Sequence, residues 1–72
     1  MTHKYLIIVE TVQNGFSAYS PDLPGCVSTG ASKAEVETNM REAISFHLEG
    51  LTESGQAIPK PSATATYIES IG

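Results

Sequence analysis

Cys26 and His47 form the one nucleophile–base pair that the chain suggests. A thiol attacks as a thiolate, which needs a base within hydrogen-bond reach and a further group that orients the base. Cys26 follows a turn signal and His47 falls on the apolar side of a predicted helix, and the spacing supplies no orienting group. We therefore interpret Cys26 as a small buried thiol and His47 as part of a packing face. A small hydrolase that uses Cys26 with His47 remains an alternative.

The carboxylates do not form the converging set that a metal-dependent nuclease needs. Asp22 stands alone in a loop, and the glutamates of the predicted helix are expected to be solvated. Cys26, His3 and His47 are at no recognisable metal spacing, and no Gly-rich phosphate loop is present. We therefore predict no catalytic residues, no metal and no cofactor, and we keep a residual nuclease that uses Asp22 as an alternative.

The charge balance is acidic, with a formal net charge of −4 from eight acidic and four basic side chains. The basic residues are scattered, whereas nucleic-acid binding relies on clustered Lys and Arg. We therefore expect no direct nucleic-acid binding, and we expect the three tyrosines to serve a core or an interface. An acidic chain can instead complement a basic protein partner.

The length of 72 residues predicts one small domain. A single core of this size rarely supplies more than about 3–5 kcal/mol of stability, so small domains usually need a disulfide, a metal or association with another chain. Cys26 has no partner for a disulfide, which leaves association with other chains, and we predict a homodimer or homotetramer. The longest apolar run, residues 5–9, is too short for a membrane helix. A signal-peptide pattern is lacking, so a cytoplasmic location is expected.

The pattern of apolar and turn residues predicts four strands and one helix. The strands are expected at residues 4–11, 16–20, 26–29 and 64–70, and the helix at residues 33–54. The order β-β-β-α-β is typical of an α+β fold, and a right-handed crossover favours a four-stranded sheet in the order 3-2-1-4. The first strand is apolar on both faces, which agrees with an internal position.

The helix prediction rests on its start signal and its apolar stripe. Ser32 and Glu35 match a capping box, in which each side chain accepts a hydrogen bond from the other residue's backbone N–H. Gly55 is the expected cap at the other end. One helix covers only one face of a sheet, so the other face or an edge is expected to contact another chain. The stripe comprises Val36, Met40, Ala43, Ile44, His47, Leu48 and Leu51.

The loop at residues 21–26 carries the most distinctive motif, Pro-Asp-Leu-Pro-Gly-Cys. It follows a Gly15-Phe16 turn and precedes Thr29-Gly30 and the capped helix, which is followed by a Pro-x-Pro segment. In this order the elements resemble the HicB antitoxin family, specifically the HicB-like N-terminal domain of type II toxin–antitoxin systems. The resemblance covers residues 5–68.

The resemblance implies a degenerate ribonuclease H-like fold and a non-enzymatic antitoxin. The implied partner is a HicA-type toxin, a small basic mRNA-cleaving ribonuclease whose active site the antitoxin covers. Dimers and higher oligomers are usual in the family. A solitary oligomeric module with a regulatory or ligand-binding role is the alternative from another class.

Two expectations follow for this chain. Residues 1–72 are expected to be a single HicB-like antitoxin domain without the C-terminal DNA-binding domain that many family members carry. The loop residues Asp22, Leu23, Pro24 and Gly25 are predicted to contact the partner, because a rigid loop loses little entropy on docking and Leu23 can act as an apolar anchor. Packing of Leu23 in the core is the alternative interpretation.

Overall fold

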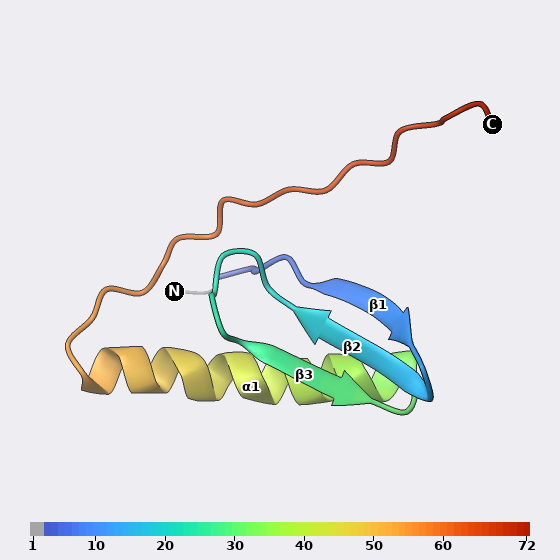
Figure 1. Ribbon diagram of the computed structural model, residues 1–72. Helices are drawn as coiled ribbons and strands as arrows, with labels where there is room; N and C mark the ends of the chain where they lie inside the picture. Colours follow the sequence, from blue (N-terminus) through green and yellow to red (C-terminus); the bar gives the residue numbers. More distant parts are fainter. Residues whose placement is uncertain (1–2) are drawn as a thin grey trace.

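The computed structural model describes residues 3–72 as three strands, one helix and a long extended C-terminal segment (Figure 1). The strands are β1 (Ile8–Val12), β2 (Gly15–Tyr19) and β3 (Val27–Gly30), and the helix is α1 (Lys33–Glu53). The strands form an antiparallel sheet in the order β1-β2-β3. The helix lies across one face of this sheet (Figure 1).

The β1–β2 hairpin is set by its turn residues. Val12 pairs with Gly15, so only Gln13 and Asn14 form the connection. Asn14 has a positive φ of 68°, a conformation that asparagine tolerates better than most residues. The turn places Val9 opposite Ala18, which puts both side chains on the face that α1 covers.

The helix begins with the predicted Ser32 cap. The Glu35 backbone N–H donates to Ser32 Oγ at 3.1 Å, and Ser32 has an extended backbone as an N-cap residue should. The Glu35 carboxylate differs from the prediction, because it accepts from the Ala31 N–H at 2.8 Å and not from Ser32. The Glu35 side chain thus binds the backbone N–H one residue before the predicted one, and this N–H still lies ahead of the helix.

The helix ends in a Schellman motif. Gly55 has a φ of 73°, its N–H donates to Thr52 O at 3.1 Å, and the Gln56 N–H donates to Leu51 O at 2.9 Å. The helix therefore stops at Glu53, one residue before the predicted end. Within residues 3–72, no helix has the length and apolar character needed to cross a membrane.

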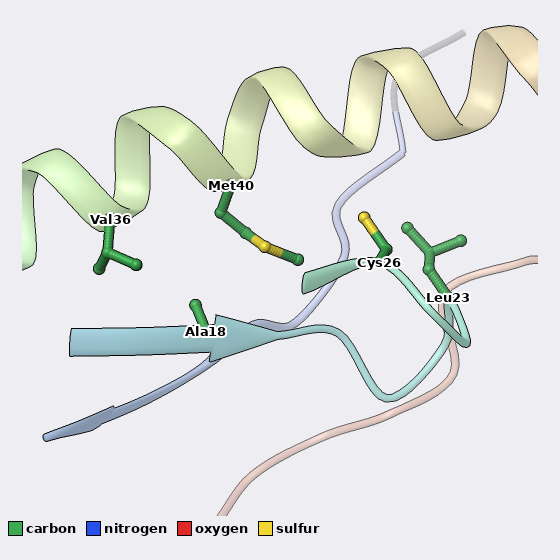
Figure 2. Packing of buried hydrophobic residues seen from close by; sticks show 5 residues of the cluster. All are labelled: Ala18, Leu23, Cys26, Val36 and Met40. Carbon is green, nitrogen blue, oxygen red and sulfur yellow. The ribbon is translucent and has the colours of Figure 1, made fainter. Parts of the chain in front are cut away.

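The core between sheet and helix is small. Its buried side chains come from β2, the loop and α1 (Figure 2): Ala18, Leu23, Cys26, Val36 and Met40. Gly30 lets the first turn of α1 approach β3, because a Cβ at this position would lie 2.6 Å from the Val36 nitrogen. Asn39 ties the same two elements together by donating from Nδ2 to Thr29 O at 2.8 Å. The N-terminal half of α1 is therefore the best-anchored part of the helix.

The predicted fourth strand, residues 64–70, is not part of the sheet, so the four-stranded order 3-2-1-4 was wrong. The sheet has three strands, and the chain after residue 63 runs away from it (Figure 1). The connector that precedes the tail explains this course. Pro59 and Pro61 restrict its backbone, and hydrogen bonds hold it to Tyr5 and to Asp22 of the loop between β2 and β3.

The first strand is consequently an edge strand, where an internal one was predicted. Its ladder begins at Ile8, opposite Tyr19, although the apolar run begins at Tyr5. Beyond Tyr19 the neighbouring chain turns off at Ser20 and Pro21, so residues 5–7 have no partner on that side. With no fourth strand on the other side, these residues remain outside the ladder.

Candidate partner-binding surface

The loop between β2 and β3 folds as two consecutive turns. The Leu23 N–H donates to Ser20 O at 3.2 Å, and the Cys26 N–H donates to Leu23 O at 3.1 Å. Leu23 is completely buried and packs beside Cys26 (Figure 2), whereas Pro24 and Gly25 are exposed. Of the four residues predicted to contact a partner, Pro24 and Gly25 therefore face outward and Leu23 supports the loop from below.

Asp22 holds the C-terminal connector. Asp22 Oδ2 accepts from the backbone N–H groups of Ser62 and Ala63, each at 3.1 Å, and Oδ1 accepts from Ser62 Oγ at 2.9 Å. The N–H groups of Ala63 and Ser62 stabilise the ionised form and hold the pKa of this carboxyl below its ordinary value. We call these three hydrogen bonds the Asp22 latch.

A shallow depression lies between the free edge of β3 and α1, next to the loop. Gly25 forms its lip, Val27 and Phe46 border it, and its volume is about 470 Å³. Val27 is 63% exposed and Phe46 is 80% exposed, and both line this depression at the edge of the sheet. We call this surface the β3–α1 depression; its further lining residues are Cys26, Ala43, His47, Gly50 and Leu51.

Two glutamates lie beside Phe46 on the surface of α1. Glu42 precedes Phe46 by four residues, and Glu49 follows it by three, so both are neighbours of Phe46 on the surface of α1. Both are exposed. An apolar side chain flanked by carboxylates suits a partner that presents an apolar pocket within a basic surround.

Sequence reasoning did not find Phe46 or Val27 as surface residues. Phe46 lies off the predicted apolar stripe of the helix, and an aromatic residue off that stripe is the signal that could have identified it. Val27 points to the face opposite Ala18 and the helix, as its pairing with Tyr19 shows. The outer face of the sheet carries a row of Ile8, Tyr19 and Val27 through these pairings.

Cys26 and His47 do line the same depression. The thiol is only 4% exposed, however, and burial raises its pKa, which disfavours the reactive thiolate. Among residues 3–72, no group of three or more His, Cys, Asp or Glu side chains is placed to hold a metal ion. The geometry thus presents a binding surface more clearly than a reaction centre.

Comparison with known proteins agrees with the sequence motif. The family model described as the HicB-like antitoxin of bacterial toxin-antitoxin system matches residues 5–71. The chain is 33% identical to a chain of a solved HicA3 and HicB3 toxin-antitoxin complex, with a TM-score of 0.72, over 83% of this chain and 70% of that one.

Relatives occur in a phage and in an archaeon. An uncharacterized 14.9 kDa protein in the rep-hol intergenic region of Haemophilus phage HP1 is 42% identical, over 89% of this chain and 48% of its own length. A UPF0150 protein of Thermoplasma acidophilum is 34% identical, over 83% of this chain and 88% of its own length. The chain thus spans about half of the phage relative, 48%, and most of the archaeal one. The predicted resemblance is confirmed, and the chain belongs to the HicB-like antitoxin family of bacterial toxin–antitoxin systems.

Proposed function

We propose that this chain binds a small basic toxin of the HicA type and neutralises it by covering the toxin's active site. One observation carries the proposal, namely the exposed pair Val27 and Phe46, with two glutamates beside Phe46, in a member of an antitoxin family. Exposed apolar clusters of this kind mark protein interaction sites more often than they serve the isolated chain.

The surface has the composition of a binding hot spot. Phe46 is the large apolar anchor, and it sits on a helix, so its position loses little entropy on binding. Pro24 and Gly25 extend the surface along the loop. Asp22 and Leu23 belong to the same contact loop and hold it in shape, through the latch and through the core.

The charge of the chain supports the same kind of partner. A net charge of −4 attracts a basic protein over long range and raises the rate of encounter. Glu42 and Glu49 concentrate this charge beside Phe46. Because such contacts are screened by salt, the association rate should fall as ionic strength rises.

The proposed antitoxin is non-enzymatic, acts in the cytoplasm without a cofactor, forms homodimers or homotetramers, and binds no nucleic acid itself. The buried thiol of Cys26, with its raised pKa, supports this view over a hydrolase. The Asp22 carboxylate supports it too, because its oxygens already accept hydrogen bonds from Ser62 and Ala63.

The test is co-expression with the product of the neighbouring gene, followed by co-purification and measurement of growth rescue. Phe46→Asp is expected to weaken the complex by about 30-fold or more, the effect of losing a hot-spot residue. Pro24→Asp tests the loop, with a smaller loss. Val12→Asp is the matched control, because Val12 is 45% exposed and does not line the depression. Unchanged binding by both Phe46→Asp and Pro24→Asp would remove this surface from the toxin contact.

The enzyme alternative is tested on RNA with the purified chain, with and without magnesium or manganese. We expect no cleavage. Metal-dependent cleavage that disappears in Asp22→Asn would replace the antitoxin proposal with a nuclease. If no toxin-like partner co-purifies and growth is not rescued, the regulatory or ligand-binding module becomes the better explanation.

A further inference from the structure

The last nine residues have the composition of a strand but pair with no strand among residues 3–72. We call residues 64–72 the C-terminal tail; it runs extended from the body and forms no ladder (Figure 1). Tyr67, Ile68 and Ile71 are 102%, 83% and 104% exposed. An ordered segment that buries none of its apolar side chains has little to offset its loss of conformational entropy.

A groove of about 590 Å³, with apolar walls and a charged rim, lies between the first strand and the helix. Tyr5, Ile7 and Val9 form one wall, and Met40 and Ile44 form the other. We call it the β1–α1 groove; Lys33, Glu37 and Arg41 form its rim. Tyr67 of the same chain reaches the mouth of the groove but remains uncovered there.

The groove runs along a free strand edge. β1 pairs only with β2, so the backbone N–H and C=O groups on its other side have no strand partner within the described residues 3–72. Residues 5–7 continue this edge without any ladder. An open edge beside an apolar groove is the arrangement that accepts an added strand, through backbone hydrogen bonds and side-chain pockets.

We propose that the C-terminal tail of one chain adds as a strand to the free β1 edge of a second copy, with Tyr67 and Ile71, which share one face of a strand, over the β1–α1 groove. Each chain carries both the tail and the groove. Two copies can therefore form a two-fold dimer in which each tail binds the groove of the other chain. This exchange is independent of toxin binding and assigns a role to a segment that the antitoxin surface does not use.

The exposed area of the chain supports a second copy as the occupant. A folded monomer of 7.6 kDa is expected to expose about 4,300 Å², whereas this chain exposes 5661 Å². The radius of gyration is 13.9 Å, against about 11 Å for a compact chain of this length. The excess of roughly 1,400 Å² per chain suffices for an interface, because stable ones bury about 1,200–2,000 Å² in total.

Charge and connector geometry support the same occupant. Glu69 is the only charged side chain after Lys60, and Arg41 on the groove rim can pair with its carboxylate, whereas Lys33 lies 3.9 Å from Glu37. The Asp22 latch and the hydrogen bond from Tyr5 to Pro59 O fix the connector on the body. Beyond the connector the tail passes the mouth of its own groove without pairing with β1, so it remains available to the β1 edge of a second copy.

The first test is the mass of the full chain in solution, measured by light scattering over a range of concentrations. We expect twice the chain mass of 7.6 kDa. The double substitution Tyr67→Ser and Ile71→Ser should raise the dimer dissociation constant by about 30-fold or more. Both residues are exposed within the chain, so the body stays folded, as circular dichroism can verify. Val27→Ser is the control for loss of an exposed apolar residue elsewhere, because Val27 is 63% exposed and lies on β3, at the opposite edge of the sheet.

The second test distinguishes exchange from folding back. One chain carries Ile7→Cys and a differently sized chain carries Tyr67→Cys or Ile68→Cys, and the two are mixed under mild oxidation. We expect a disulfide between the two chains; native Cys26 is buried, and the unsubstituted chain is the control. A monomeric mass, a dimer indifferent to the tail substitutions, or a link formed only when one chain carries both cysteines would each overturn the exchange. No toxin is present, so failure here leaves the antitoxin proposal untouched.

Discussion

The first strand and the C-terminal tail are similar in composition, but only the first strand pairs in the sheet. Both are rich in β-branched and aromatic residues without an interior proline, and strands were predicted at residues 4–11 and 64–70. β1 is a strand because a two-residue turn brings β2 beside it. The tail follows a connector that is hydrogen-bonded to the loop, and although Tyr67 reaches the mouth of the β1–α1 groove, the tail forms no ladder with the free β1 edge. Strand propensity therefore produces a strand only where the chain is aligned with a pairing edge.

The two regions also differ in what stabilises them. Residues 8–56 hold the buried core and both helix caps, whereas the tail buries no apolar side chain. Substitutions in the first region should change the free energy of unfolding of the whole domain. Substitutions in the tail and its latch should change only local protection or association.

The largest effect is expected for Met40→Ala. Met40 is fully buried between α1 and the sheet, and losing such a side chain costs about 2–5 kcal/mol. That is comparable with the total stability of about 3–5 kcal/mol that a core of this size supplies. Urea unfolding followed by circular dichroism measures the loss. Val12→Ala is the control at an exposed position, and an equal loss in both variants would contradict the assigned core.

A matched pair of glycines should separate close packing from helix propensity. Gly30→Ala is expected to destabilise by about 1–3 kcal/mol, because the new Cβ would lie 2.6 Å from the Val36 nitrogen. Gly50→Ala meets nothing within 4 Å and should stabilise the helix by about 0.5–1 kcal/mol. Thermal unfolding midpoints that shift in opposite directions are the expected result, and a loss of stability in both would show that Gly50 is also packed.

A smaller effect is expected at the helix cap. Ser32→Ala removes the acceptor of the Glu35 N–H and should cost about 1 kcal/mol. Ser32→Asp keeps an acceptor and should retain most of the stability. If urea unfolding places both variants at the same reduced stability, the cap hydrogen bond is not the cause.

The smallest effect on the body is expected at the Asp22 latch, where the readout is amide exchange at Ser62 and Ala63. The pKa of Asp22 is lowered, so the latch contributes fully above the ordinary aspartate pKa of about 3.9 and is lost as pH falls through the lowered pKa. Asp22→Ala should release both amides at neutral pH without moving the unfolding midpoint of residues 8–56. Protection that persists in Asp22→Ala would mean that other contacts hold the connector.

Local signals in the sequence predicted the local structure well. The Ser32 cap, the Gly55 stop and the three N-terminal strands are confirmed within one residue at most ends, because turns and caps depend on neighbours in the chain. The start of β1 is the exception, at Ile8 where Lys4 was predicted. Its extent depended on the fourth strand, and that pairing is absent.

The candidate site could be predicted only in part. The loop motif identified the family, and the structure shows Pro24 and Gly25 exposed there. Leu23, predicted as an anchor, is buried, and its partner contact stays a prediction together with that of the other loop residues. Phe46 and Val27 were missed, because their meeting depends on how α1 lies across β3.

The sequence by itself determined the family, the turn, the helix and its caps, since each depends on residues within a few positions of one another or on a continuous motif. It also determined that a chain this small, with one cysteine, has little to stabilise it alone. Only the tertiary structure decided that β1 is an edge, that the tail leaves the sheet, and that Phe46 and Val27 share a surface. These outcomes depend on contacts between segments that are distant in the sequence. The hydrogen bonds that hold the connector to Asp22 and Tyr5 direct the tail, and the β1 edge is left without a partner strand among residues 3–72.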